Sequence, residues 1–152
     1  MKIRQISIFI ENQPGHLRSA CRLLADAGID VESMALADTE QFGILRFIVK
    51  DWEKAKQVFE NEGLVVRESE LVAVSVDDRP GGLADVLDVL DQTKINIEYM
   101  YGHATRNSRK AILFFRFNNI DEAIQQLNAH NIPMISSDEL FKNSCKQNDR
   151  LQ

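Results

Sequence analysis

The chain has 152 residues, of which 44% are hydrophobic and 27% charged, and its formal net charge is −5 at pH 7. This length fits one ordinary domain or two small ones, and the composition is that of a globular protein with enough apolar residues for a core. The acidic balance argues against binding to nucleic acid or to an anionic membrane, because both depend on clustered lysine and arginine.

No apolar run reaches the roughly 18 residues that a membrane-spanning helix needs, and Met1 to Arg4 lead into a strand pattern instead of a signal peptide. The chain has only Cys21 and Cys145, which are too few for a disulfide framework. We therefore expect a cytoplasmic protein.

The first strand and helix show clear periodicity. Alternation of Ile6, Ile8 and Ile10 with more polar residues predicts a strand with one buried face. A helix follows, with its apolar stripe predicted at Leu17, Cys21, Leu24 and Ala25. In chain order we expect a strand at 3–11, a helix at 14–27, strands at 29–37 and 42–50, a helix with Asp51 as N-cap that ends at Gly63, and a strand at 64–70.

The second half repeats the first. Pro14-Gly15-His16-Leu17 recurs as Pro80-Gly81-Gly82-Leu83, an offset of 80 − 14 = 66 residues, and Ile29-Asp30-Val31-Glu32 recurs as Ile95-Asn96-Ile97-Glu98. Later in the repeat the offset is 68 residues, so a loop in between is two residues longer in the second copy. We expect strands at 71–77, 95–104, 109–117 and 132–135, a helix from 81 to about 93, and a helix capped by Asn119.

The order βαββαβ predicts an α+β fold of two tandem ferredoxin-like modules, each a four-stranded antiparallel sheet with two helices on one face. The predicted domains are residues 1–70 and 71–138, followed by a polar C-terminal tail at 139–152 that we expect to be frayed. The bare sheet faces carry Phe9, Ile44 and Ile48 beside Arg46 in the first copy, and Ile112 and Phe114 in the second. Such apolar faces need a cover, so we expect the copies to associate and two chains to form a homodimer.

The turn between the first strand and first helix of each copy is the candidate site. Glycine lets the backbone approach a ligand, and the N–H groups and dipole at a helix start attract an anion such as a carboxylate. The oxygen atoms of Asn12, Asp78 and Asn96 can accept hydrogen bonds from an ammonium group. Donors for a carboxylate and acceptors for an ammonium group together suit a zwitterionic ligand.

The second copy, with Asp77-Asp78-Arg79-Pro80-Gly81-Gly82-Leu83 before its helix and Ile95-Asn96-Ile97-Glu98 after it, resembles an ACT domain. The first copy resembles it less closely, since His16 replaces a small residue. The resemblance spans about residues 2–137. ACT domains are mostly regulatory appendages that bind amino acids, so a pair with no catalytic domain attached is expected to be a sensor or a regulatory subunit that acts on a separate enzyme in trans.

The resemblance implies that a free amino acid binds at an interface between two modules, where the turn of one faces the early second strand of the other. The implied contacts are Asn12, Gln13, Gly15, His16 and Leu17 in one turn, Asp78, Arg79, Gly81, Gly82 and Leu83 in the other, and Asp30, Val31, Asn96 and Ile97 on the strands. We favour the interface between the two copies as the binding site. Which copy binds the ligand stays open.

Other interpretations compete. Asn12 and Asp78 can equally be turn-capping residues, and His16 a solvated one. The segment 110–117 faintly resembles the RNA-recognition strand of the RRM, but the adjoining strand has no aromatic residue, so Phe115 and Phe117 are predicted to be core. A protein-interaction module without a small ligand is a further alternative.

We expect neither catalysis nor a metal or other cofactor. The fold also hosts small hydrolases, but Ser7, Ser75 and Cys21 have no evident base beside them. The three histidines and two cysteines lack metal-ligand spacing. His103 and His130 are predicted to lie on the surface, and the basic loop at 103–110 is predicted to be a solvated hairpin.

Overall fold

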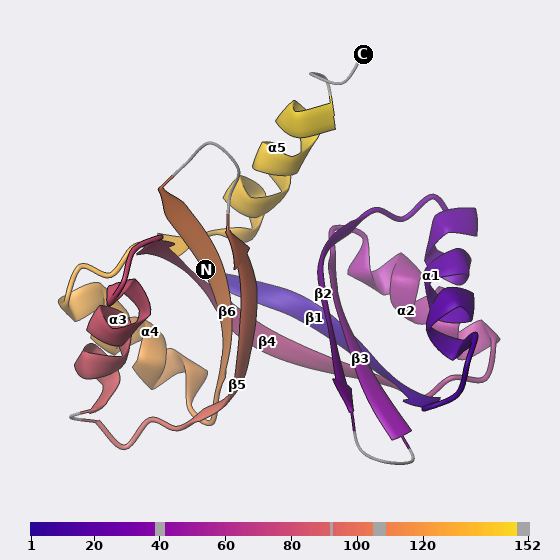
Figure 1. The fold of residues 1–152 in the computed structure, drawn as a ribbon, viewed down its shortest axis with the longest axis horizontal. Helices are drawn as coiled ribbons and strands as arrows, with labels where there is room; N and C mark the ends of the chain where they lie inside the picture. The colour runs from indigo at the N-terminus through magenta and orange to yellow at the C-terminus, as the bar shows by residue number, and fades with distance from the viewer. Residues whose placement is uncertain (39–41, 92, 105–108, 149–152) are drawn as a thin grey trace. The chain divides into compact units, whose positions relative to one another are not determined.

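The computed structural model describes residues 1–38, 42–91, 93–104 and 109–148. The chain divides into two compact units (Figure 1). The N-terminal unit is Arg4–Ser69, and the C-terminal unit comprises Met1–Ile3 together with Glu70–Gln152. Four residues of the basic loop, 105–108, lie outside the described ranges.

The N-terminal unit has the predicted element order. Its strands are β1 (Lys2–Glu11), β2 (Val31–Asp38), β3 (Phe42–Val49) and the first residues of β4 (Val66–Asp77), and its helices are α1 (His16–Asp26) and α2 (Trp52–Asn61). The strands follow the order β2-β3-β1-β4, and the pairs that β3 forms with β1 and β2 are antiparallel. Both helices lie on one face of the sheet (Figure 1).

The core of this unit lies between that face and the helices. Ile6, Ile8 and Ile10 point into it as predicted, and the Phe47 and Phe59 rings stack with 5.6 Å between their centroids. On α1 the predicted stripe is wrong in part. The buried residues are Ala20 and Leu24, with Leu23 and Ala27 half-buried against the same core, whereas Leu17 and Ala25 are exposed.

The C-terminal unit repeats this arrangement. It contains the rest of β4, then α3 (Gly82–Asp91), β5 (Ile97–Ala104), β6 (Lys110–Phe117), α4 (Ile120–Ala129), β7 (Met134–Ile135) and α5 (Ser137–Asn148). The strands follow the order β5-β6-β4-β7, all antiparallel. The α+β fold of two ferredoxin-like modules is therefore confirmed.

Two further predictions in the C-terminal unit are confirmed. Phe115 and Phe117 are fully buried in its core. Asn119 caps α4, since its side-chain oxygen accepts a hydrogen bond from the Glu122 N–H at 3.3 Å. In the N-terminal unit, Asp51 occupies the predicted N-cap of α2, but its side chain makes no capping hydrogen bond.

The join between the units differs from expectation. The two strands predicted at 64–70 and 71–77 form one continuous strand, β4, and the boundary between the units falls inside it, after Ser69. No loop or glycine-rich linker marks this boundary. At the other end, Lys2 belongs to the C-terminal unit, where its Nζ forms ion pairs with Glu70 at 3.1 Å and Asp121 at 3.0 Å.

The tail predicted to be frayed instead forms α5 over residues 137–148. The Ser136 hydroxyl accepts a hydrogen bond from the Glu139 N–H at 3.3 Å, while the Glu139 carboxylate accepts one from the Ser136 N–H at 3.0 Å. This reciprocal capping box satisfies two N–H groups at the helix start. Leu140, only 1% exposed, then anchors the first turn.

The sheet faces that carry no helices are predicted to need a cover. Of the apolar residues predicted there, Ile48, Ile112 and Phe114 are buried, and Phe9 and Ile44 are half-buried. The expectation that β1 buries one face only is wrong, because Gln5 and Ser7 on its other face are buried and hydrogen bonded, with Nε2 to Oγ at 3.0 Å. Among the described helices, none combines the length and apolar content needed to cross a bilayer.

Candidate ligand site at the strand-to-helix turns

The two strand-to-helix turns have the same backbone geometry. In the first, the Gln13 N–H donates to the Glu11 carbonyl at 2.9 Å and the His16 N–H to the Gln13 carbonyl at 3.3 Å. In the second, the Arg79 N–H donates to the Asp77 carbonyl at 2.9 Å and the Gly82 N–H to the Arg79 carbonyl at 3.1 Å. Gly15 and Gly81 both have positive φ, at 93° and 89°, a conformation that glycine adopts without strain.

The start of α1 is uncapped by any side chain. Gly15 occupies the N-cap and has no side chain to accept hydrogen bonds from the first helical N–H groups, and the first turn contains no acidic residue. Asn12, Gln13 and Gly15 are exposed and His16 is half-buried. Leu17, predicted to contact ligand, is 38% exposed. These features leave the positive end of the helix dipole accessible to an anion.

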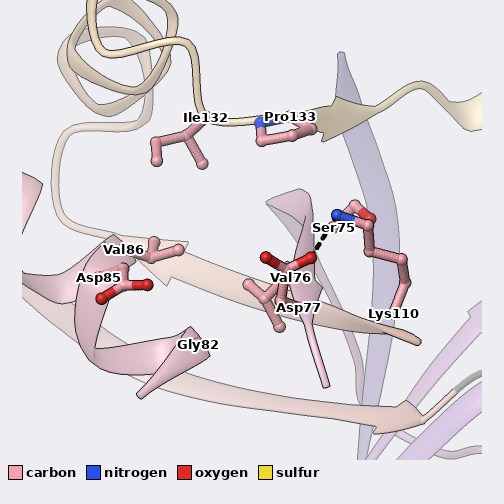
Figure 2. A pocket seen from close by; sticks show the side chains of 9 residues that line it. All are labelled: Ser75, Val76, Asp77, Gly82, Asp85, Val86, Lys110, Ile132 and Pro133. Atoms are coloured by element: carbon pink, nitrogen blue, oxygen red, sulfur yellow. Dashed lines mark hydrogen bonds and ion pairs between the residues drawn. The ribbon is translucent and has the colours of Figure 1, made fainter. Parts of the chain in front are cut away.

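The second turn carries a network of charges. The Lys110 ammonium lies 2.6 Å from one Asp77 oxygen, and the Arg79 guanidinium lies 3.7 Å from the other while also pairing with Asp85. The hydrogen bond and charge of Lys110, with a smaller contribution from Arg79, hold the pKa of the Asp77 carboxyl below its ordinary value. Figure 2 shows the ion pair between Asp77 and Lys110 at the edge of a small cavity.

This cavity, about 180 Å³ in volume, lies between the end of β4, the start of α3 and the segment before β7. Gly82 lines it and is buried. A Cβ at position 82 would lie 2.1 Å from the Asp77 carbonyl oxygen, so the turn is tight enough to admit only glycine there. Gly81 and the predicted contacts Asp78 and Arg79 are exposed, and Leu83 is half-buried against the core.

The predicted contacts on the early second strands lie elsewhere in each unit. Val31 pairs with Val49 at one end of β3, whereas Glu11, which begins the turn, pairs with Phe42 at the other end. Seven residues of strand separate these ends, which is about 23 Å. A single unit therefore does not bring its own turn and its own early second strand together, and a site that uses both needs two modules.

Each of these strand residues has a local structural role. The Asp30 carboxylate accepts a hydrogen bond from the Val31 N–H at 3.0 Å, and the Asn96 N–H donates to the Asn118 side chain at 2.9 Å. Val31 and Ile97 are half-buried against their cores. Asp30 and Asn96 are the exposed members of the set.

Sequence reasoning missed several residues around the turns. Asp85, Lys110 and Ile132 line the C-terminal cavity, and Glu11, Ser19 and Leu64 line a second one. Asp77 and Lys110 are directly opposite in the sheet, but their pairing follows from the register between β4 and β6, which the sequence does not specify. His103, predicted on the surface, is half-buried with its ring 6.2 Å from that of Phe114, whereas His130 is exposed as predicted. Among the described residues, no group of three His, Cys, Asp or Glu side chains could hold a metal ion.

A family model described as "ACT domain pair" matches residues 1–143. The chain belongs to this family. Among solved structures, protein BT0572 from Bacteroides thetaiotaomicron is similar to this ACT domain pair at 33% identity and a TM-score of 0.87, covering 93% of this chain and 97% of that one.

Two more distant structures share the fold. The regulatory subunit of aspartate kinase from Thermus thermophilus, in a ligand-free form, is 21% identical with a TM-score of 0.61, covering 84% of this chain and 91% of that one. The same subunit from Thermus flavus is 22% identical with a TM-score of 0.63, covering 85% and 90%. No curated protein matches the sequence.

Proposed function

We propose that this ACT domain pair binds a free amino acid and, in response, regulates a separate enzyme. The observation that carries the proposal is the start of α1, where a glycine N-cap and an acid-free first turn leave the helix N–H groups to a ligand carboxylate. Oxygen acceptors for an ammonium group lie in the same turn, on Glu11 and Asn12.

A site between modules is supported by the separation of the turn from the early second strand within each unit. We place the ligand between a turn (Asn12, Gln13, Gly15, His16 and Leu17, or Asp78, Arg79, Gly81, Gly82 and Leu83) and the strand starts of another module (Asp30, Val31, Asn96 and Ile97). The fold shared with two aspartate kinase regulatory subunits supports a regulatory role without naming the target enzyme.

Pairing of two chains is part of this proposal. β2 stands at the end of the strand order and exposes Met34 and Leu36, which are 42% and 50% accessible. An edge strand with exposed apolar side chains is a ready surface for another chain.

A thermal-shift screen against the twenty amino acids tests the proposal. A ligand at about 100 times its dissociation constant adds about 2.7 kcal/mol to the free energy of unfolding, which raises Tm by several degrees for a chain of this size. The screen is run on the parent and on Gly15→Leu and Gly81→Leu, since both substitutions place a side chain where φ is positive.

We expect one amino acid or a small group to raise the Tm of the parent, and one of the two variants to lose that shift while it stays folded by circular dichroism. If no amino acid shifts the Tm at millimolar concentration, the amino-acid-binding proposal is wrong. The interpretation as a protein-interaction subunit without a small ligand then replaces it.

A further inference from the structure

Each unit contains a cavity at the same place in its module. The N-terminal cavity is lined by Ile10, Glu11, His16, Ser19 and Ala20, and the C-terminal one by the residues 66 positions later, Val76, Asp77, Gly82, Asp85 and Val86. Each lies between the end of the first strand, the start of the first helix and the segment that leads into the last strand. The two cavities therefore have equivalent lining positions in the internal repeat.

The two cavities differ in size. The N-terminal cavity has a volume of about 380 Å³, within the range of small-molecule sites, whereas the C-terminal cavity has about 180 Å³, below that range. The two linings also differ at one equivalent position, where His16 in the N-terminal unit corresponds to Gly82, whose tight turn leaves no room for a Cβ.

The charges differ at equivalent positions as well. Asp77 lies opposite Lys110 across the sheet and pairs with it, while Glu11 lies opposite Phe42, which is 53% exposed. Among the described residues, no cationic side chain forms an ion pair with Glu11. The Glu11 carboxylate is exposed at the rim of its cavity, so it is available to accept hydrogen bonds from a ligand's ammonium group.

The starts of α1 and α3 also differ in the charge of their first turns. α3 has Asp85 in its first turn, and Arg79 pairs with it, so the positive end of that helix already faces a carboxylate of the protein. The equivalent residue on α1 is the neutral Ser19. Behind these polar groups, the N-terminal cavity is apolar, with Ile10 and Ala20 buried and Leu23 and Leu64 half-buried.

We propose that the N-terminal cavity alone is the specificity pocket of the pair and selects an aliphatic α-amino acid, one per chain. The ammonium group pairs with Glu11, the carboxylate lies at the start of α1 beside His16, and the aliphatic side chain enters the cavity toward Leu23 and Leu64. In the C-terminal unit, Lys110, Arg79 and Asp85 satisfy the corresponding groups internally. This inference rests on the proposed amino-acid binding and adds the class of ligand and the unit that holds it.

Isothermal titration calorimetry with L-leucine, L-isoleucine, L-valine, L-aspartate and L-lysine tests the proposed class of ligand. We expect one site per chain and at least one aliphatic amino acid to bind about tenfold or more tightly than the charged ones, because only an aliphatic side chain gains by burial in the cavity. Glu11→Gln should weaken binding by about tenfold or more, and the matched Asp77→Asn should leave it unchanged. Ser19→Phe, at an exposed position on the cavity rim, should also abolish binding by filling the entrance.

Methyl NMR on the full chain, during titration with the tightest-binding amino acid, tests which cavity holds the ligand. Shifts confined to Ile10, Leu23 and Leu64, with Val86 and Ile132 unchanged, would support the inference. Shifts at Val86 and Ile132 instead, or preference for a charged amino acid, would overturn it and leave the proposed amino-acid binding intact. If none of the twenty amino acids binds, the proposed function itself fails, and this inference fails with it.

Discussion

The ion pair between Asp77 and Lys110 is one residue-scale difference between the two turns of this ACT domain pair. Their position opposite each other on β4 and β6 is equivalent to that of Glu11 and Phe42, so one cross-strand pair is ionic and the other is not. Because the ion pair is exposed, its contribution to stability is small, and its effect is to occupy the Asp77 carboxylate.

The pH dependence of Asp77 follows from that contact. Lys110 holds the folded pKa of Asp77 below the ordinary value of 3.8, so the associated stability is present above that value and is lost as the pH falls through the lower folded pKa. We expect carboxyl NMR titration to give a pKa for Asp77 below 3.8, and Lys110→Met to raise it toward that value. An unchanged Asp77 pKa in Lys110→Met would contradict the contact.

At the scale of elements, α5 shows how a short local motif outweighs composition. Its sequence is polar, but the segment from Ser136 to Glu139 has the S-x-x-E spacing of a capping box, and the buried Leu140 ties the helix to the unit. The Ser136 N–H and hydroxyl, which donate to the Glu139 carboxylate, hold the pKa of that carboxyl below its ordinary value.

Removal of the cap tests the origin of this helix. Ser136→Ala should destabilise α5 by about 0.5–2 kcal/mol, since it removes the acceptor for the Glu139 N–H. Amide hydrogen exchange at Leu140, whose N–H donates to the Ser136 carbonyl at 3.0 Å, should then become faster. Ser137→Ala is the matched control, and equal acceleration in both variants would show that the capping box is not the cause.

At the scale of the whole molecule, the regulatory proposal requires a partner, and a second copy of the chain is the first candidate. The exposed Met34 and Leu36 on the edge strand β2 are the apolar residues that such a contact would cover.

Sedimentation at micromolar concentration tests this pairing. We expect the parent to sediment as a dimer and Leu36→Lys to sediment as a monomer, because a buried lysine without a partner opposes the interface. Val65→Lys replaces a residue that is 65% exposed outside the strands, and it should remain a dimer. A parent that sediments as a monomer would rule out the homodimer.

The sequence by itself determined the architecture and the family, because these depend on local signals that the internal repeat supplies twice. Strand alternation at Ile6, Ile8 and Ile10, the Asn119 cap and the two Pro-Gly turns each specify their element through backbone sterics and nearby contacts. Local signals also misled, as on α1, where the buried stripe depends on how the helix is rotated against the sheet.

Only the tertiary structure decided which charges meet at each turn and how much space lies beside it. The register that places Lys110 opposite Asp77 and Phe42 opposite Glu11, the absence of room for a Cβ at Gly82, and the volume of each cavity all arise from contacts between residues far apart in the chain. Periodicity specifies which face of a strand or helix is buried, but pairing across the sheet and the tightness of packing decide which charges meet and how much space remains.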